Sequence, residues 1–403
     1  MATTSFLYHS FGLASYDHHR TEFLNGWNYF HVSLKEHHRR CRNCKARWNF
    51  LQKDGTFERT FFAVPCGLRP QFVVLRGHRQ RCLKCKKVQR EPIRFALGQR
   101  RYLKGFARYV VALCKLLPIK NVAELLGVGW DMVKEIHKEY LAKKWRKRKL
   151  GKVRYVAIDE FAIQKGHRYM TIVMDLETGE ILHAQKGKGA DAVEGFLRKL
   201  KTVAKLKAIA ADMSGAYKSA VLSVFGSDLD LIHDPFHVVA LASKAIDETR
   251  RELVREAAPD AKGIIKGTRF LLLRGLENLN EKGLSRLAEL MELNRPLYQA
   301  YLLKEDLRTF WNMNGVEAET FLDNWLRQAR ALGNRFFAKL ADTLDAHRKG
   351  LLCYFKHRIS TGPLEGLNNK IKVLKRMAYG YRDMEYFKLR LYDLHQCNPS
   401  VFP

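Results

Sequence analysis

Residues 153–176 read VRYVAIDEFAIQKGHRYMTIVMDL, and this stretch decides which fold we expect. It contains two apolar runs, one that ends at Asp159 and one that covers residues 169–176. Residues 177–180, ETGE, have the composition of a tight turn, and a third apolar run follows at 181–185. Short apolar runs joined by turn residues predict three antiparallel strands in a meander.

Helix and strand patterns alternate downstream of this meander. A helical apolar period covers residues 190–206 and another covers 213–225, whereas 208–211 and 229–232 are short apolar runs typical of buried strands. The order of elements is therefore βββαβαβ. This order predicts a mixed sheet with helices packed on its faces.

Acidic residues follow two of these predicted strands. Asp159 ends the first strand and Asp212 follows the fourth. Because a sheet aligns the ends of its strands, the two carboxylates should converge, and they repel each other unless a proton or a divalent cation lies between them. Magnesium suits such a site, since it prefers oxygen ligands and leaves positions for phosphate oxygens. A single aspartate at a strand end is more often a turn residue, and Asp175, Asp234 and Glu160 are alternatives to this pair.

Four of the eight cysteines form two CxxC pairs, CRNC at 41–44 and CLKC at 82–85. Two such pairs around strand-like segments are typical of zinc ribbons, although the separation exceeds the usual spacing of roughly 15–20 residues. The alternatives are unreactive surface thiols and a redox CxxC pair, which needs a βαβ context. The predicted zinc ligands are Cys41, Cys44, Cys82 and Cys85. The other cysteines, expected to be buried as small apolar residues, are Cys66, Cys114, Cys353 and Cys397.

Residues 101–144 have a helical period that is interrupted at Pro118 and at LGVG, 126–129. Two short amphipathic helices joined by a glycine-containing turn predict a helix-turn-helix, with residues 130–140 as the helix that enters a DNA groove. An ordinary helical hairpin has the same pattern. The basic run KKWRKRK at 143–149 is typical of a solvated linker or of phosphate contacts. Its predicted DNA-binding residues are Lys143, Lys144, Arg146 and Arg148.

The composition favours a protein that binds nucleic acid. The 403 residues carry 72 Lys and Arg against 41 Asp and Glu, for a formal net charge of +31, and residues 1–150 hold 32 of the basic side chains but only 10 of the acidic ones. Such an excess favours a polyanionic partner, with nucleic acid ahead of an anionic membrane surface. No apolar run reaches the roughly 18 residues of a membrane span, and the first 30 residues lack the apolar core of a signal peptide. We therefore expect a soluble intracellular protein.

The last part of the chain returns to a polar pattern after a long helical segment, 236–355. Residues 360–372 read STGPLEGLNNKIK, in which Pro363 suits the first turn of a helix and Glu365 can interact with the free N-terminal amides. The predicted buried stripe of this helix is Leu364, Leu367, Ile371 and Leu374. The face that carries Glu365 also holds Asn368, Asn369, Lys372 and Arg376. One carboxylate among amides and bases is typical of a surface that faces phosphates.

Three acids, Asp159, Asp212 and Glu365, each on the appropriate element of a βββαβαβ unit, make the chain resemble the RNase H-like, retroviral-integrase-like catalytic core of DDE transposases. More closely, the chain resembles bacterial insertion-sequence transposases of the ISL3 type. The resemblance covers nearly the whole chain, and the helical insertion of that family takes up the long separation between the second and third acids. The strings that carry it are AIDE at 157–160, ADMSGAY at 211–217, HDPFHV at 233–238 and residues 362–376 followed by YGY at 379–381.

The resemblance implies a mechanism. Asp159, Asp212 and Glu365 hold two Mg²⁺ ions, with Asp159 bridging both and with Mn²⁺ able to replace Mg²⁺. Water attacks a phosphodiester at the end of the element, and the freed 3′ hydroxyl then attacks target DNA. The zinc ribbon and helix-turn-helix recognise the terminal inverted repeats, while Lys372 and Arg376 hold the DNA backbone. The partners are double-stranded DNA, both element ends and target, and a second copy of the chain in a dimer on DNA. The implied location is the bacterial cytoplasm, at the nucleoid, without membrane contact.

The expected fold class is multidomain α+β. The predicted parts are an N-terminal segment (1–35), a zinc-binding ribbon (36–97), the helix-turn-helix region with its basic linker (98–150), the first part of the RNase H-like core (151–235), the helical insertion (236–355) and the C-terminal helices of the core (356–403). The alternatives are a zinc-dependent transcriptional regulator without catalysis, in which the three acids are dispensable, and an RNase H-like nuclease without strand transfer.

Overall fold

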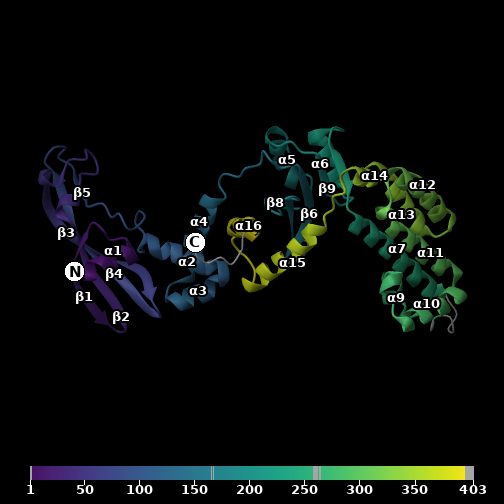
Figure 1. Cartoon of the computed structure of the whole chain (residues 1–403), viewed down its shortest axis with the longest axis horizontal. Coiled ribbons are helices and arrows are strands. Elements are labelled where there is room, and N and C mark those ends of the chain that lie inside the picture. The colour runs from purple at the N-terminus through teal and green to yellow at the C-terminus, as the bar shows by residue number, and fades with distance from the viewer. Residues whose placement is uncertain (1, 165, 167, 257–261, 263–264, 395–403) are drawn as a thin grey trace. The chain divides into compact units, whose positions relative to one another are not determined.

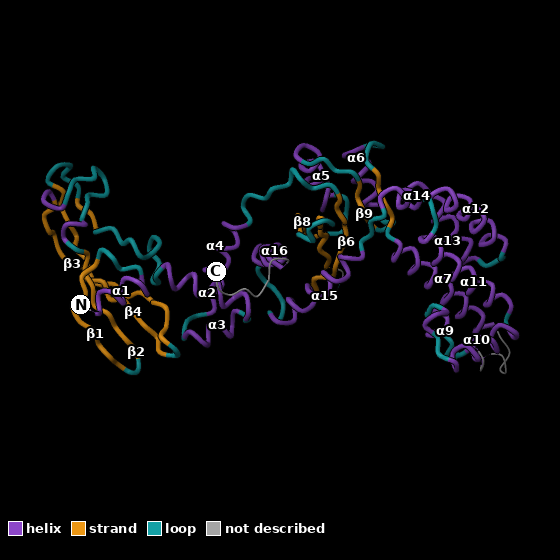
Figure 2. The backbone as a smooth tube through the Cα atoms, in the orientation of Figure 1, coloured by secondary structure: helices purple, strands orange, loops and turns teal. Residues whose placement is uncertain are grey.

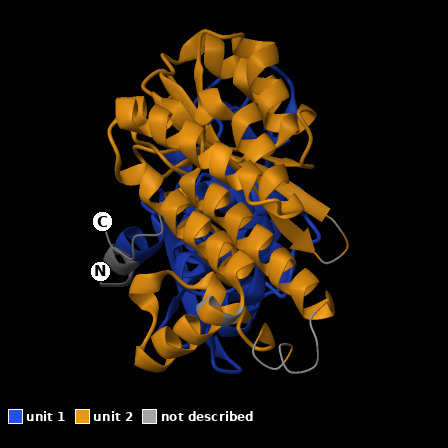
Figure 3. Cartoon of the chain, turned by 90° about the vertical axis from the view of Figure 1, so that its right-hand side faces the viewer, with its two compact units in different colours: residues 1–147, 375–403 blue, residues 148–374 orange. Residues whose placement is uncertain are grey.

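The computed structural model describes residues 2–164, 166, 168–256, 262 and 265–394. The chain divides into two compact units (Figure 3). The first combines residues 1–147 with 375–403, and the second covers 148–374. The fold is a multidomain α+β arrangement, as the sequence predicts, and it contains two separate mixed sheets.

The first unit contains a five-stranded sheet (Figure 2). Its strands run in the order β1-β2-β4-β3, with β5 on the far part of β4. The pairs β1·β2 and β3·β4 are antiparallel, whereas β2 and β4 are parallel. The N-terminal residues therefore share one sheet with the cysteine-bearing segment. The bounds are β1 (Tyr16–Leu24), β2 (Trp27–Leu34), β3 (Leu51–Cys66), β4 (Arg69–Cys82) and β5 (Val88–Arg90).

Helices α1 (Ala2–Phe11), α2 (Lys104–Leu116), α3 (Ile119–Leu126) and α4 (Trp130–Lys144) complete the core of this unit. The turn between α3 and α4 begins at Gly127, whose φ of 63° is the left-handed conformation that glycine adopts freely at a helix end. Helix α16 (Met384–Asp393) packs on α4, where the buried His137 Nδ1 lies 2.8 Å from the Tyr386 hydroxyl. The last helix that the structure describes thus belongs to the same unit as α4, the second helix of the predicted helix-turn-helix.

The second unit contains the predicted meander (Figure 1). Its sheet has the order β10-β9-β6-β7-β8, in which β6, β7 and β8 are antiparallel neighbours and β6, β9 and β10 are parallel neighbours. The expected βββαβαβ order is confirmed. The bounds are β6 (Tyr155–Gln164), β7 (Arg168–Asp175), β8 (Ile181–Lys186), α5 (Asp191–Val203), β9 (Ala208–Ala211), α6 (Gly215–Phe225) and β10 (Asp230–His233).

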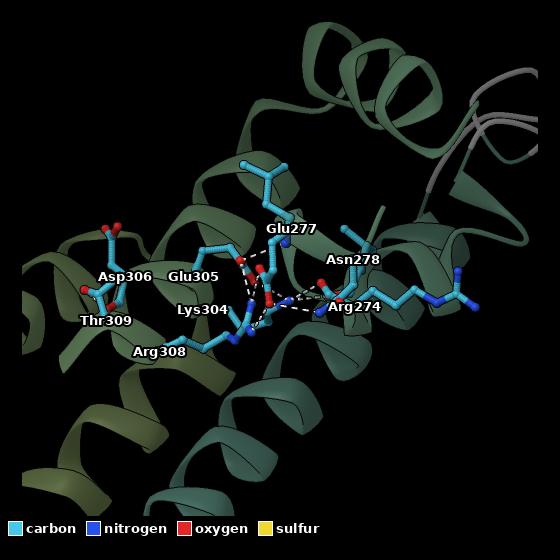
Figure 4. Close-up of polar contacts among 10 residues, drawn as sticks. Arg274, Glu277, Asn278, Lys304, Glu305, Asp306, Arg308 and Thr309 are labelled. Atoms are coloured by element: carbon cyan, nitrogen blue, oxygen red, sulfur yellow. Dashed lines mark hydrogen bonds and ion pairs between the residues drawn. The ribbon is translucent and has the colours of Figure 1, made fainter. Parts of the chain in front are cut away.

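A helical segment follows β10, as predicted, and has a hydrophobic core of its own that includes the nearly buried Trp325. A buried lysine ties it together (Figure 4). Lys304 Nζ donates hydrogen bonds of 2.8 Å to the carbonyls of Leu272 and Arg274 and pairs with Glu305, which lets the cation remain buried. The bounds are α7 (Pro235–Glu256), α9 (Arg269–Leu273), α10 (Glu281–Leu293), α11 (Arg295–Thr309), α12 (Gly315–Ala331), α13 (Arg335–Ala346) and α14 (Arg348–His357).

Helix α15 (Gly362–Met377) then carries the predicted polar face. Its buried residues are Leu364, Leu367, Ile371 and Leu374, which is the stripe expected from the sequence. Among the described residues, no helix is both long enough and apolar enough to cross a membrane.

Candidate catalytic site and cysteine cluster

The sheet of the second unit brings Asp159 and Asp212 together. Strands β6 and β9 are parallel, with Ala157 opposite Ala210. Two residues further along each strand, the same register places Asp159 beside Asp212, on strands that lie about 4.8 Å apart. β9 ends at Ala211, whereas β6 continues in its hairpin with β7. Asp159 therefore lies within its strand, at the level where its neighbour ends.

The pKa directions of the two carboxyls agree with this placement. Burial raises the pKa of Asp159, against hydrogen bonds from the Glu160 amide and from Asn368 that favour its charged form. Burial also raises the pKa of Asp212, and the charge of Asp159 raises it further. His237 acts in the opposite direction on both carboxyls. The site thus holds two partly desolvated acids, and the negative charge of Asp159 disfavours that of Asp212.

Helix α15 contacts this pair through Asn368, whose side-chain amide donates a 2.9 Å hydrogen bond to Asp159 Oδ2. The other amide atom, Asn368 Oδ1, is buried, and no described residue gives it a hydrogen-bond partner. A buried carbonyl-type oxygen without a partner is unfavourable. Carboxylate and carbonyl-type oxygens are ligands that Mg²⁺ and Mn²⁺ accept.

Glu365 lies one helical turn before Asn368, on the same face of α15. Its side chain is exposed. Within the described part of the chain, the cysteine cluster is the one group of at least three His, Cys, Asp or Glu side chains whose ligand atoms all lie within 4.8 Å of one another. The three predicted catalytic acids do not form so tight a group. The structure therefore pairs two of them and places the third on the adjoining helix face.

The alternative acids have other partners. Asp234 is buried, and its Oδ1 accepts a 2.9 Å hydrogen bond from the Thr361 amide, which fixes the start of α15. Asp175 accepts hydrogen bonds from the turn that follows β7, and Glu160 accepts one of 2.8 Å from the Tyr217 hydroxyl. Asp175 is thus a turn residue, whereas Asp234 connects the sheet to the helix that carries Glu365.

His237 is a site residue to which the sequence assigned no role. It lies in the first turn of α7, directly after β10, and is partly exposed. A positive charge on it lowers the pKa values of both Asp159 and Asp212, so it lies near the acid pair. The string HDPFHV marked this region, but nothing in the spacing shows that a helix begins there with His237 near the acid pair.

The predicted DNA-binding residues fall into two groups. On α15, Asn369, Lys372 and Arg376 are exposed, whereas Asn368 is engaged with Asp159. In the basic linker, Lys143 and Arg146 are exposed. The other two linker residues make protein contacts: Lys144 Nζ pairs with Asp393 Oδ1 at 2.6 Å, and Arg148 donates to the carbonyls of Ile181 and Leu182.

The predicted groove-reading helix, α4, has an unexpected distribution of charge. Its lysines Lys134 and Lys138 pair with Asp383, next to α16. Two acidic residues of the same helix, Glu135 and Glu139, both pair with Arg100. The exposed Trp130 lies at the first residue of α4. Only this N-terminal end of the helix is free of ion pairs among the contacts that the described residues make.

The four predicted zinc ligands form one cluster. Their sulfur atoms all lie within 4.8 Å of one another, with 3.6 Å from Cys41 Sγ to Cys85 Sγ and 3.6 Å from Cys44 Sγ to Cys82 Sγ. Four sulfurs at about 2.3 Å from a tetrahedral zinc ion are about 3.8 Å apart. The cysteine geometry therefore fits zinc.

The two CxxC segments have the same backbone structure. In one, the Cys41 amide donates to the Ala46 carbonyl at 2.9 Å, and in the other the Cys82 amide donates to the Lys87 carbonyl at 3.0 Å. Each segment also has a left-handed residue after its second cysteine, Lys45 with φ 60° and Lys86 with φ 59°. Two matching knuckles at the end of the β3–β4 hairpin thus point their thiols at a common centre.

The surroundings of Cys41 favour the thiolate that a metal needs. Burial opposes its ionisation, but hydrogen bonds from the Cys44 and Asn43 amides and from neighbouring thiols outweigh burial and lower its pKa to about 6. Outside the cluster, Cys114 is buried as expected, whereas Cys353 is only partly buried. The expectation for Cys66 is wrong, because it ends β3 at a hairpin turn and is exposed. Cys397 lies outside the described residues.

Comparison with known proteins agrees with this architecture. The family model for transposases of the DDE type, ISL3 group, matches residues 156–391, which include both aspartates and α15. The chain belongs to the ISL3 transposase family. It is 35% identical over 330 residues to the transposase for insertion sequence element IS1001 of Bordetella parapertussis, which covers 79% of this chain and 80% of that relative.

A second relative of this transposase is more distant. The transposase for insertion sequence element IS1557, from two strains of Mycobacterium tuberculosis, is 29% identical over 291 residues, which is 65% of this chain and 64% of that protein. The matched family region of this chain begins within β6 and ends within α16. It therefore spans the acid pair, the helical segment and the helix that carries Glu365.

Proposed function

We propose that this transposase cleaves DNA at the ends of an insertion sequence and joins the freed ends to target DNA, with divalent cations held by Asp159, Asp212 and Glu365. The observation that carries the proposal is the pair of partly buried aspartates, Asp159 on β6 and Asp212 directly after β9, which the register of the two strands places side by side. Asn368 of α15 contacts Asp159. A polar cluster so close to a helix with exposed amides and bases suits a phosphodiester substrate.

The sheet supports an RNase H-like core. Its order, with an antiparallel meander on one side of β6 and two parallel strands on the other, agrees with the βββαβαβ topology implied by the family resemblance. In this reading the helical segment from α7 to α14 is an insertion between the last strand and the helix that brings the third acid.

Each residue of the site has a proposed task. Bound magnesium would supply Lewis-acid activation of the scissile phosphodiester and of the attacking oxygen. Asp159 and Asp212 provide carboxylate ligands, and Asn368 holds the orientation of Asp159. Glu365, which is exposed on α15, completes the ligand set because a divalent cation removes the repulsion between the three carboxylates. Lys372 and Arg376, on the same helix, hold the DNA backbone.

The first unit is proposed to bind the terminal inverted repeats, with a structural zinc ion in the cysteine cluster. Support comes from the excess of basic residues in 1–150 and from the paired knuckles. The proposal places DNA contacts at Lys143 and Arg146 and at the free end of α4 near Trp130. Because two element ends must meet, a dimer on DNA is the proposed assembly.

Cleavage of DNA that carries the element's ends, in the presence of Mg²⁺, tests this function. Asp159→Asn should abolish cleavage while binding to the same DNA remains. Glu177→Gln is a suitable control, since Glu177 is an acid near a strand end of the same sheet that pairs with Arg154 instead. Equal cleavage by wild type and Asp159→Asn would remove the acid pair from the mechanism. The regulator alternative predicts that neither protein cleaves DNA, and it gives no reason to place two partly buried carboxylates side by side.

A further inference from the structure

The backbone of Asp212, the second aspartate of the acid pair, contacts His233, which in turn contacts His347. His233, the last residue of β10, is almost fully buried, and its Nδ1 lies 3.3 Å from the backbone carbonyl of Asp212. On the other side of the ring, His233 Nε2 lies 2.9 Å from Nδ1 of His347. His347 ends α13 and precedes α14. A continuous chain of two hydrogen bonds therefore runs from the helical segment to Asp212.

The acceptor at the end of this chain fixes the protons. A backbone carbonyl can only accept, so His233 Nδ1 must carry a hydrogen. With its hydrogen on Nδ1, the neutral His233 ring has Nε2 as its acceptor. His347 Nδ1 must then donate to it. Each ring thus has one required tautomer, which gives the chain a direction from His347 to the Asp212 carbonyl.

The backbone around His233 is built for this contact. Gly350 of α14 is buried, and a Cβ added there would lie 2.7 Å from His233 Nε2 and 3.0 Å from the Leu231 carbonyl. Glycine therefore allows α14 to pass directly over the imidazole. The ring is enclosed by the helix and has little room to rotate away from the Asp212 carbonyl.

We propose that His233 is a positioning residue that sets the backbone of Asp212 for divalent-cation binding, and that His347 holds His233 in place from the helical segment. The inference rests on the proposed function of Asp212 as a ligand. It assigns the helical segment a part in the site, because the segment supplies the hydrogen bond that orders His233. Partners of metal-binding residues contribute roughly 10- to 100-fold in metal affinity when they are removed.

His347 offers the sharpest test, since it is only partly buried and ends a helix. His347→Ala removes the donor, whereas His347→Asn keeps an N–H group at nearly the same distance from the backbone. We would measure binding of Mn²⁺ alone to the full-length protein by electron paramagnetic resonance, without DNA or turnover. His347→Ala should weaken Mn²⁺ binding about tenfold, and His347→Asn should restore most of it. His233→Asn should fall between wild type and His233→Ala, because its amide can still reach the Asp212 carbonyl.

A second histidine provides the matched control. His357 also ties α14 to β10, through a 2.8 Å contact from its Nε2 to Asp230 Oδ2, but at the opposite end of the strand. His357→Ala should reduce the melting temperature without changing Mn²⁺ affinity. If His347→Ala and His357→Ala both leave Mn²⁺ affinity at the wild-type value, the positioning role is wrong.

Asp212→Asn distinguishes a failure of the proposed function from a failure of the positioning role of His233. If Asp212→Asn abolishes Mn²⁺ binding and DNA cleavage while the histidine variants behave as wild type, the proposed function stands and this inference fails. If Asp212→Asn leaves both unchanged, the proposed function itself fails. If His347→Ala loses both Mn²⁺ binding and the circular dichroism signal of the folded protein, His347→Asn decides the question. Recovery of Mn²⁺ binding in His347→Asn is expected if the N–H group matters, and a general folding defect at this position does not predict it.

Discussion

The cysteine cluster and the acid pair are both candidate metal sites, but they are assembled differently. Each half of the cysteine cluster is formed by residues three apart, and the two halves meet at the end of one hairpin. The acidic site takes Asp159 from β6, Asp212 after β9 and Asn368 from α15, with the whole helical segment between the last two. In the first site all four sulfur atoms lie within 4.8 Å of one another, whereas the second site consists of two neighbouring aspartates and a separate third acid, Glu365.

This difference follows from the charge of the ligands. The cysteine side chains hydrogen-bond to one another, Cys41 to Cys85 and Cys44 to Cys82, so the knuckles can gather them through backbone geometry. Carboxylates repel, and burying them is unfavourable, as the raised pKa values of Asp159 and Asp212 show. The cysteine cluster should therefore stabilise the folded protein, whereas the acid pair, which the proposed catalysis needs, should destabilise it. Substitutions in each of the two sites test that contrast.

Loss of one cysteine should have the largest effect. Cys82 is fully buried in the cluster, and Cys82→Ser should abolish stoichiometric zinc binding. Because structural zinc contributes roughly 10–16 kcal/mol of binding free energy in small zinc domains, the knuckle end of the β3–β4 hairpin should unfold. Zinc content by atomic emission and hydrogen exchange of residues 40–50 and 80–90 would measure this.

The control is Cys66→Ser, since Cys66 is exposed and lies outside the cluster. It should keep both zinc and protection from exchange. Mn²⁺ binding at the acidic site should survive Cys82→Ser, because the acids belong to the other compact unit. Joint loss of zinc and Mn²⁺ binding in Cys82→Ser would contradict the independence of the two sites.

Removal of the amide that contacts Asp159 should have an intermediate effect. Asn368→Ala deletes the 2.9 Å hydrogen bond to Asp159 Oδ2 and the unpartnered buried oxygen. We expect Mn²⁺ affinity and cleavage to fall roughly 10- to 100-fold, as for other groups that orient metal ligands. Asn369→Ala, an exposed neighbour on the same helix, should leave Mn²⁺ affinity unchanged. Equal effects of the two substitutions on Mn²⁺ binding would place Asn368 among the DNA contacts instead.

Local pattern was enough to predict the parts of both sites. The apolar runs predicted strands and helices, and the CxxC spacing predicted which thiols meet, because these features depend on neighbouring residues. The apolar stripe of α15 also followed from its period of three and four residues. The length of the strands did not follow, since β3 and β4 extend well beyond their apolar centres and are paired along polar residues as far as Cys82.

Contacts between distant segments could not be predicted. Nothing in the sequence shows that Asn368 reaches Asp159, that His237 lies near the acid pair, or that Asp234 holds the Thr361 amide. The same holds for α4, whose lysines are paired with Asp383 through the packing of α16. Charge patterns indicate a class of partner, but tertiary ion pairs decide which of those charges remain free.

Asp159→Asn should change the free energy of unfolding less than the other substitutions, and the sign of that change is informative. The pKa of Asp159 is higher in the folded protein than in the unfolded chain, so folding favours the protonated carboxyl. The resulting contribution to folding stability is fully present below the pKa of the unfolded chain, and it is lost as the pH rises through the pKa of the folded protein. At pH 7 the charged carboxylate is a net burden, and Asp159→Asn should stabilise the protein by roughly 0.5–2 kcal/mol while abolishing cleavage. This gain in stability should shrink toward pH 3.5.

Glu177→Gln should instead reduce the stability at pH 7, because the hydrogen bond from Arg154 lowers the pKa of Glu177. Thermal unfolding of the three proteins at both pH values measures these differences. A destabilised Asp159→Asn at pH 7 would mean that the acid pair supports the fold, and the contrast with the cysteine cluster would be lost.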